Sequence, residues 1–489
     1  MMAASDVEGA ILREVARILR EGEHDLDPSR SLSELGVDSL GYCTISSFVE
    51  RQFGVTVPPQ TLFEFSSVEA TAAHVASLIA GQPAAAQAAP AAPAATLAAV
   101  EAQYSPRDIA IIGLACKLPG AGDASQYWDL IRGGASVIQE FPSRRAPAAD
   151  SPGYLKGGFV EDVDAFDAAF FGISPREALA MDPQQRLVLE CAWQTFENAG
   201  YATARLSGSD TAVFVGASSF DYYELLLRTQ AARTTHIGTG VSHAVLANRV
   251  SQQFNLKGAS EAIDTACSSG LVALWHGVEA LRRGESKLAL VGGVNVLASR
   301  TPFQVFADAG MLSQEGACRP FDARAAGYVR GEGVACVLLK RAADAVRDGD
   351  RIWAVIKGGA VRHGGRTNSL TAPNPDAQAD VIVAAVADAD VDPLSIGFVE
   401  AHGTGTSLGD PIEAEGLTRA FRRLHAERGR DSVAPHFTIG SVKAQIGHLE
   451  AAAGLAGLLK AVLALGHRQI PGSPHLTEIN PRINLAAAR

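Results

Sequence analysis

A cysteine and two histidines stand in sequence contexts that suit thioester chemistry. Cys267, in Asp-Thr-Ala-Cys-Ser-Ser, follows a β-leaning run and precedes an amphipathic helical stretch that ends at Gly284. The dipole at a helix N-terminus favours a thiolate, so we expect a lowered pKa and a nucleophilic sulfur at Cys267. The alternative is an inert buried cysteine, which this placement alone leaves open.

The two histidines each follow a run typical of a buried strand. His402 opens His-Gly-Thr-Gly-Thr after residues 396–401, and His448 lies in Gly-His-Leu-Glu after residues 437–440. A single histidine at a strand end is more often structural, but neighbouring glycines let another backbone or a ligand approach closely. One cysteine and two histidines in such positions together predict a site that processes thioesters.

The elements that must position these residues alternate between short apolar runs and helical stretches rich in alanine and leucine. Runs typical of buried strands occupy residues 109–112, 212–215, 288–291, 335–339 and 352–356. Strand and helix patterns at this spacing predict a layered α/β domain. The stretch that comes nearest to a membrane span, residues 451–465, contains Lys460, so we expect a buried helix there.

The first 80 residues predict a small acidic domain made of helices. Apolar residues recur with a helical period in residues 11–19 and 45–53, and Ser67 could cap a last helix. This part has twelve acidic residues, five arginines and no lysine, so it carries −7 of the total charge of −11. Such a surface suits docking to basic patches on partner enzymes, although a merely solvated acidic face fits equally well.

An uncharged segment separates this part from the rest of the chain. Residues 82–98 include ten alanines and three prolines, a composition typical of a semi-flexible linker. We therefore predict a helical domain at residues 1–81, a linker at 82–104 and an α/β domain at 105–489.

The composition excludes several classes of protein. A hydrophobic content of 47% in 489 residues excludes a mainly disordered chain. The net charge of −11 argues against nucleic-acid binding. The N-terminus has no signal-peptide pattern, and the six cysteines show no metal-ligand spacing. We expect a cytoplasmic protein without a metal site or a membrane span.

The contexts of Cys267, His402 and His448 resemble the three signature motifs of β-ketoacyl synthases. Residues 181–186, Met-Asp-Pro-Gln-Gln-Arg, are similar to the modular type I polyketide synthase branch. The resemblance covers nearly all of residues 105–489 and implies a thiolase-like ketosynthase domain with five layers, αβαβα. Residues 35–40, Leu-Gly-Val-Asp-Ser-Leu, resemble the attachment motif of acyl carrier proteins. This implies a four-helix carrier domain with 4′-phosphopantetheine on Ser39, which is otherwise a helix cap.

The resemblance implies polyketide chain elongation by decarboxylative Claisen condensation. An acyl chain from a carrier would be held on Cys267, while a malonyl-type extender arrives on another carrier. His402 and His448 would stabilise the enolate. Lys443 would orient His448 and add positive field, with a nearby carboxylate from Glu413 or Glu450. The resemblance also implies that Thr404 and Thr406 contact the pantetheine arm.

The same resemblance implies partners of several kinds. These are acyl-thioester substrates, other polyketide synthase modules and carrier proteins, and a second copy of the chain in a homodimer. Residues 363–374 resemble the branch whose acyltransferase is a separate protein. Two alternatives to elongation stay open: a transacylase that does not extend the chain, and a non-catalytic docking scaffold. The presence of both histidines disfavours the transacylase.

The end of the sequence keeps the scaffold alternative open. Ketosynthases usually continue through a turn of the Gly-Phe-Gly-Gly-Thr-Asn type, whereas this sequence stops at Arg489. In the family, the oxyanion on the acyl carbon is met by two backbone N–H groups, one from the nucleophilic cysteine and one from that turn. We therefore expect these 489 residues, tested alone, to condense poorly.

Overall fold

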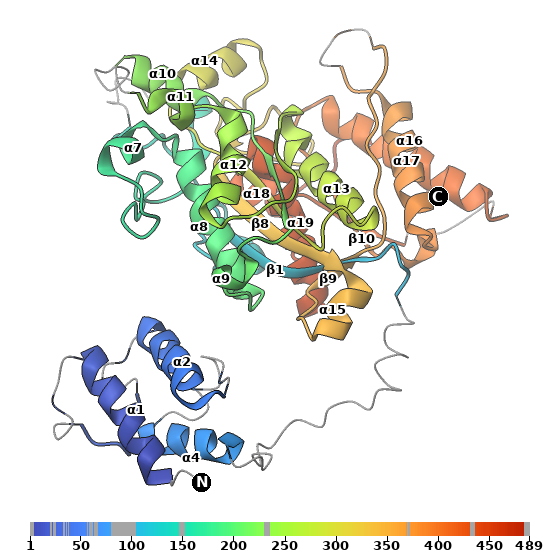
Figure 1. Cartoon of the computed structure of the whole chain (residues 1–489). Helices are drawn as coiled ribbons and strands as arrows, with labels where there is room; N and C mark the ends of the chain where they lie inside the picture. Colours follow the sequence, from blue (N-terminus) through green and yellow to red (C-terminus); the bar gives the residue numbers. More distant parts are fainter. Residues whose placement is uncertain are drawn as a thin grey trace. The chain divides into compact units, whose positions relative to one another are not determined.

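The structure is a computed structural model in which two compact units, residues 1–93 and 94–489, are distinguished (Figure 1). It describes residues 4–19, 22, 26–32, 35, 37, 39–55, 57, 62, 67–79, 104–145, 152–228, 235–367, 369, 372–430 and 436–483. All of the predicted linker except Tyr104 lies outside these residues. The proposed domain boundaries therefore stay predictions.

The first unit is helical, as its periodicity predicts. Its described helices are α1 (Ala4–Leu19), α2 (Ser39–Phe53) and α4 (Val68–Ile79). Their apolar faces meet in one buried core that includes Val7, Ile11, Val15, Ile45, Val49, Val68 and Val75. The Ser67 hydroxyl accepts a hydrogen bond from the Ala70 amide at 3.1 Å and so caps α4, as expected. The prediction of an all-α carrier domain is confirmed for this described part.

A six-stranded mixed sheet forms the centre of the second unit, in the order β5-β4-β6-β8-β1-β9. Strands β4, β5 and β6 pair in parallel, and β8 and β9 run antiparallel to their neighbours. All five predicted strand runs lie in it. Its strands are β1 (Ile109–Lys117), β4 (Ala212–Gly216), β5 (Ser260–Ile263), β6 (Leu288–Asn295), β8 (Gly333–Arg341) and β9 (Ala354–Ile356).

Helices cover both faces of this sheet. Along β1, Ile109 and Ile111 join a core with α13 (Ser269–Arg282) and α19 (Ala453–His467). The alternate residues Ala110 and Ile112 join a second core with two other helices. Those helices are α8 (Pro183–Asn198) and α12 (His243–Gln253). Burial on both faces explains why these strands are continuously apolar in sequence.

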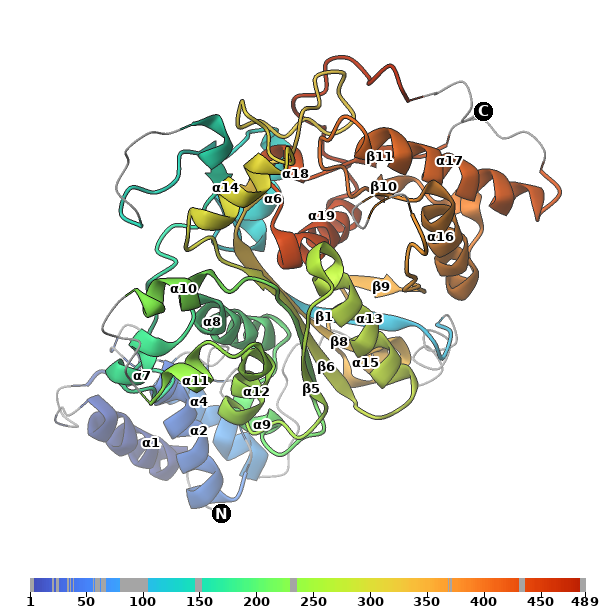
Figure 2. The same cartoon turned by 90° about the horizontal axis from the view of Figure 1, so that it is seen from above.

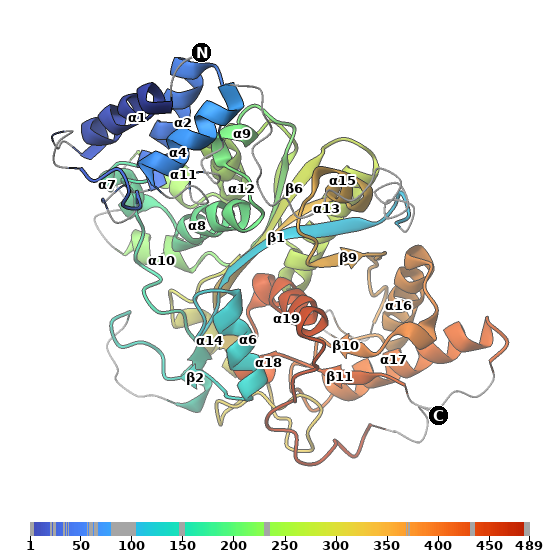
Figure 3. The same ribbon diagram turned by 90° about the horizontal axis from the view of Figure 1, so that it is seen from below.

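A second, parallel sheet completes the layering. In the described residues it consists of β10 (Phe398–Glu400) and β11 (Thr438–Gly440). Figures 2 and 3 both place these strands between α19 and α17 (Gly409–Ala426), beside which α16 (Pro375–Ala389) packs. The order helix, sheet, helix, sheet, helix confirms the predicted thiolase-like arrangement.

Shorter elements connect these layers. They are α6 (Ala124–Gly133), β2 (Ile138–Gln139), η2 (Gly153–Leu155), β3 (Gly157–Gly158), α7 (Pro175–Ala180), α9 (Thr203–Leu206), α10 (Asp221–Leu227), α11 (Ile237–Gly240), η4 (Ala266–Ser268), α14 (Thr301–Asp308), β7 (Arg330–Gly331), α15 (Ala342–Asp348), η5 (Pro393–Ser395), α18 (Lys443–Ile446) and η6 (Glu450–Ala452). One helical stretch, Glu450–His467, is long and apolar enough to cross a membrane, and 61% of it is buried inside the fold. The expected buried helix is therefore present.

Candidate active site

A tight turn presents Cys267 between β5 and α13. Cys267 lies in η4, and Ala266 before it has a left-handed backbone with φ of 56°. The turn is held by hydrogen bonds from the Thr265 amide to the Ser269 hydroxyl (2.9 Å) and from the Ala266 amide to Asp264 Oδ1 (3.0 Å). The predicted position between a strand and the start of a helix is thus observed.

The environment of the Cys267 thiol differs from the expectation. Burial, and secondly the charge of Glu450, raise the pKa of this thiol to about 11, while the Lys443 cation acts in the opposite direction. The prediction of a lowered pKa is therefore wrong, because desolvation of the thiolate outweighs the favourable charges. The resting nucleophile is a neutral thiol that must lose its proton as it reacts.

Close packing of α13 on η6 brings the reactive groups together. A Cβ atom added at Gly270 would lie 2.8 Å from the Ala451 carbonyl oxygen, so only glycine permits this approach. As a result, the Cys267 sulfur, a ring nitrogen of His448 and a carboxylate oxygen of Glu450 all lie within 4.8 Å of one another. Two residues of one distant motif, His448 and Glu450, therefore share a site with the nucleophile.

His448 is buried and has a defined proton position. Its Nδ1 accepts a hydrogen bond from the Glu450 amide at 3.0 Å, so the neutral ring carries its proton on Nε2. Nε2 finds no hydrogen-bond partner in the part of the chain that the structure describes. Burial and the charge of Lys443 hold the pKa of His448 well below its ordinary value. The ring thus offers an unpaired N–H donor inside the site.

His402 stands beside His448 on the loop after β10. The ring centroids are 5.3 Å apart, with the rings nearly perpendicular at 86°. Glu413 on α17 holds the loop, because its carboxylate accepts hydrogen bonds from the amides of His402 (2.6 Å) and Gly403 (2.8 Å). His402 is an exposed residue, yet desolvation of its ring and the charge of Lys443 lower its pKa. This imidazole is also neutral at neutral pH.

Lys443 lies buried at the start of α18 and acts through its field. Its charge lowers the pKa values of Cys267, His402 and His448. Among the residues that the structure describes, no hydrogen bond joins Lys443 to His448, so the predicted orientation of His448 by Lys443 stays a prediction. Instead, the backbone amide of Glu450 fixes the ring. Of the two carboxylates expected near Lys443, Glu413 holds the His402 loop and Glu450 lies next to the nucleophile.

Comparison with known proteins identifies the family to which this site belongs. Residues 106–345 match the N-terminal domain of β-ketoacyl synthases, and residues 353–477 match their C-terminal domain. A ketosynthase domain of the oxazolomycin system, OzmH KS7 of Streptomyces albus JA3453, is 41% identical with a TM-score of 0.71, covering 78% of this chain and 68% of that one. The chain belongs to the β-ketoacyl synthases. Residues 9–75 further match a phosphopantetheine attachment site.

Other relatives of this ketosynthase are polyketide synthases. The ketosynthase of module 6 of the bacillaene synthase from Bacillus subtilis 168 is 37% identical, with a TM-score of 0.71, covering 77% of this chain and 64% of that one. The polyketide synthases PksN of Bacillus subtilis and ThaG of Burkholderia thailandensis are 37% and 48% identical over 98% and 78% of this chain. The chain spans 9% and 7% of their respective lengths.

The ketosynthase loop that carries His402 also carries the two predicted pantetheine contacts. Thr404 and Thr406 are both partly buried, and their hydroxyl oxygens lie 3.4 Å apart. The Thr406 hydroxyl accepts a hydrogen bond at 3.1 Å from the amide of Gly409, the first residue of α17. Thr404 and Thr406 lie two and four residues after His402 in the sequence. Their contact with pantetheine stays a prediction.

Ser39, the predicted attachment residue, is the first residue of α2. A hydroxyl can form the phosphodiester that links the prosthetic group, so the residue type and its place at a helix start fit 4′-phosphopantetheine. When bound, this group supplies a terminal thiol on a long arm, which carries acyl groups as thioesters. The Ser39 side chain itself lies outside the described part of the structure.

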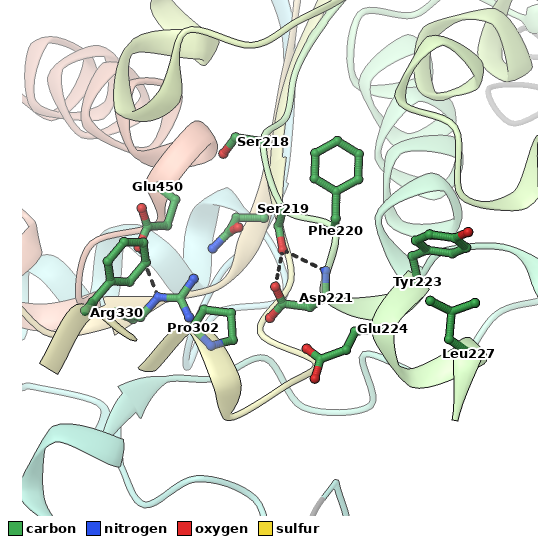
Figure 4. Close-up of a pocket in the computed structure, with 12 residues that line it drawn as sticks. Ser218, Ser219, Phe220, Asp221, Tyr223, Glu224, Leu227, Pro302, Arg330 and Glu450 are labelled. Atoms are coloured by element: carbon green, nitrogen blue, oxygen red, sulfur yellow. Dashed lines mark hydrogen bonds and ion pairs between the residues drawn. The ribbon is translucent and has the colours of Figure 1, made fainter. Parts of the chain in front are cut away.

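A cavity of about 490 Å³ opens beside Glu450 (Figure 4). Figure 4 shows Arg330 and Glu450 facing each other on one side, with Tyr223 and Leu227 across the cavity. Arg330 donates from Nε to Glu450 at 3.2 Å. Sequence reasoning missed Arg330, because it reaches the site through strand-like pairing of residues 329–331 with His448, more than a hundred positions later. No local pattern signals such a contact.

Proposed function

We propose that this chain elongates polyketide chains by decarboxylative Claisen condensation, and that Cys267, His402, His448 and Lys443 carry the reaction. The observation that supports this most directly is the unpaired Nε2–H of His448, which lies in the same site as the Cys267 thiol. A neutral N–H group can donate a hydrogen bond to the enolate oxygen. Its position beside the sulfur places the enolate next to the acyl group that Cys267 carries.

In the first step, Cys267 takes the acyl group from an acyl thioester. The sulfur attacks the thioester carbonyl, a bond from carbon to Sγ forms, and the bond to the departing thiol breaks. The proton of Cys267 leaves with that thiol. Because burial raises the pKa of Cys267 to about 11, proton loss accompanies the attack rather than preceding it.

In the second step, a malonyl-type thioester loses carbon dioxide and becomes an enolate. The electron pair of the broken carbon–carbon bond moves to the thioester oxygen, where N–H groups of His448 and His402 stabilise the charge. The enolate carbon then attacks the acyl carbon, and the bond to Cys267 breaks. Protonation of the released thiolate restores the thiol and closes the cycle.

Several partners follow from this role. The acyl donor and the malonyl donor arrive on carrier proteins, one of which is the N-terminal domain with Ser39 as its attachment residue. The family relationship supports a homodimer and exchange with other polyketide synthase modules. The resemblance of residues 363–374 supports an acyltransferase that acts as a separate protein. A cytoplasmic location accords with the sparse, unpaired cysteines.

The test combines acylation with condensation. The protein is incubated with an acyl-pantetheine thioester, digested and mapped by mass spectrometry. The label is expected on Cys267, whereas the buried Cys116, Cys191, Cys318 and Cys336 serve as internal controls. Cys267→Ala should abolish labelling, and labelling of another cysteine would overturn the assignment.

A second measurement separates the alternatives. Malonyl on a separate carrier is added to the acylated protein, and the release of carbon dioxide and the mass of the product are followed. A product extended by two carbons supports elongation. Acylation without a new carbon–carbon bond would support the transacylase instead if a version of the chain extended through the turn of the Gly-Phe-Gly-Gly-Thr-Asn type gives the same result. The absence of acylation would support the scaffold.

A further inference from the structure

The thiol of Cys267 must lose a proton inside a buried site when it takes an acyl group. Because its pKa is raised to about 11, only about one thiol in 10⁴ is ionised at pH 7. A proton acceptor beside the sulfur offsets such a deficit, since it removes the proton while the new bond forms. Two side chains lie close enough to serve, because the Cys267 sulfur, a ring nitrogen of His448 and a carboxylate oxygen of Glu450 are within 4.8 Å of one another.

His448 has no lone pair free for this proton. Its Nδ1 accepts the hydrogen bond of the Glu450 amide at 3.0 Å, and its Nε2 already carries a hydrogen. The charge of Lys443 favours the thiolate, but an ammonium group has no lone pair either. Within the described part of the chain, the cluster around the sulfur therefore contains one group that can accept the proton, the carboxylate of Glu450.

The carboxylate of Glu450 has one oxygen free. Oε1 accepts from Arg330 Nε at 3.2 Å, whereas Oε2 receives no hydrogen bond from the residues that the structure describes (Figure 4). Glu450 also adopts a left-handed backbone with φ of 47°, which glycine would adopt without strain. A glutamate kept at a strained backbone position beside the nucleophile points to a use for its carboxylate.

The charges around Glu450 set its basicity. The titratable groups that face it from neighbouring elements are Cys267 in η4, His448 before η6, Tyr328 just before β7, Arg330 in β7 and Asp221 in α10. Burial raises the pKa of Glu450, and the Arg330 guanidinium acts in the opposite direction. A raised pKa makes the carboxylate a stronger base, while Arg330 favours its ionised form. Cys267 and Glu450 together then hold one negative charge, since two adjacent charges repel each other.

We propose that Glu450 is the general base for acyl transfer to Cys267. This rests on the proposed function, in which Cys267 takes the acyl group from a thioester. The S–H bond breaks as its proton moves to Glu450 Oε2, and the electron pair of the sulfur forms the bond to the acyl carbon. The bond from that carbon to the departing thiol breaks, and the departing sulfur takes the proton from Glu450. The carboxylate is thereby restored, and no other reactant is consumed.

Glu450→Gln tests this role, because glutamine has nearly the same size and keeps an oxygen that can accept from Arg330. Two rates are measured at Cys267 in the full chain by peptide mass spectrometry: acylation by butanoyl-pantetheine and alkylation by iodoacetamide. Acylation is expected to fall by about 10² or more, the usual contribution of a general base. Alkylation is expected to rise, because loss of the Glu450 charge lowers the pKa of Cys267 and iodoacetamide consumes the thiolate. Glu415→Gln, which alters a surface carboxylate paired with Arg419, is the matched control and should change neither rate.

The opposite signs separate a general base from a structural role. If Glu450 only holds Arg330 in place, its replacement would slow both reactions in folded protein, as checked by thermal unfolding, and the proposal would be wrong. Acylation that stays equal or becomes faster in Glu450→Gln would also overturn it. Glu450→Asp keeps a carboxylate and should acylate faster than Glu450→Gln, so equal rates of these two variants would contradict the base. If the wild type is not acylated at Cys267 at all, the proposed function itself fails, a result distinct from the other three.

Discussion

Replacing His448 by alanine should separate the two steps of the reaction. The Nε2–H of His448 is a fixed, buried donor, and we propose that it stabilises the enolate formed by decarboxylation. Acyl loading develops its oxyanion on the acyl carbon, where the family resemblance implies backbone N–H donors instead. Loss of one such donor typically costs about 2.7–4 kcal/mol of transition-state stabilisation. Condensation in His448→Ala should therefore fall by about 10²–10³, while acylation of Cys267 stays detectable.

The structure also predicts a cost in stability for the same variant. Without the ring, the Glu450 amide loses its acceptor at Nδ1, and a buried unpaired donor costs about 1–3 kcal/mol. Thermal unfolding of His448→Ala should thus be measured beside its kinetics. His436→Ala is a suitable control, because the His436 ring contacts the Pro393 carbonyl at 3.0 Å and His436 does not line the cavity beside Glu450.

The assay follows both products from one sample. Acyl-enzyme is quantified by intact mass, and the extended thioester is quantified after addition of malonyl-carrier. A fall in condensation of less than about tenfold would refute the argument that His448 is a main enolate donor. Equal losses of acylation and condensation in folded protein would show that His448 acts on the nucleophile instead.

Three further outcomes are expected. Alkylation of Cys267 by iodoacetamide should accelerate about tenfold per pH unit from pH 7 to 9, because the pKa of the thiol is raised to about 11. Lys443→Met should slow the alkylation at each pH, because it removes the cation that lowers this pKa. A rate that reaches a plateau below pH 8 would contradict the raised pKa. Incubation with coenzyme A and a phosphopantetheinyl transferase should add one prosthetic group, measured by intact mass, and Ser39→Ala should prevent it. Asp322→Asn should lower the free energy of unfolding in urea by about 1.5–3 kcal/mol, because Asp322 accepts from Arg324 and the Thr477 amide. These contacts hold the pKa of Asp322 below its ordinary value, so their stabilisation is present above about pH 4 and is lost as the pH falls.

The strands and the layered architecture could be predicted because their signal is local. A strand buried on both faces is a continuous apolar run, and the runs at 109–112, 212–215, 288–291 and 335–339 all lie in the central sheet. The run at 352–356 is shorter in the structure, where β9 begins at Ala354. β9 is the edge strand of the sheet and pairs with the first three residues of β1, so the backbone hydrogen bonds of the sheet hold only a short segment of this run.

The cysteine and the histidines could be located in the sequence for a similar reason. Cys267 follows β5 and His402 follows β10, as expected, whereas the helix α18 separates His448 from β11. The glycines beside the two histidines have left-handed backbones: Gly403 and Gly447 have φ of 44° and 77°. A Cβ added at Gly403 would lie 2.7 Å from that of Ser441. The contact of Arg330 with Glu450 could not be located from the sequence, since Arg330 reaches the site through backbone pairing with His448, which lies far away in the sequence.

The error about Cys267 has a physical cause that also explains how the site works. A helix terminus is visible in sequence, but the desolvation that raises the thiol pKa arises from the packing of α13 on η6. Desolvation and the charge of Lys443 lower the pKa values of His402 and His448, so the thiol and both imidazoles are uncharged at rest. Charge then appears only as the thioester reacts, in surroundings of low dielectric where a fixed N–H donor stabilises it more than water would. A permanent thiolate at Cys267 would be repelled by the adjacent charge of Glu450.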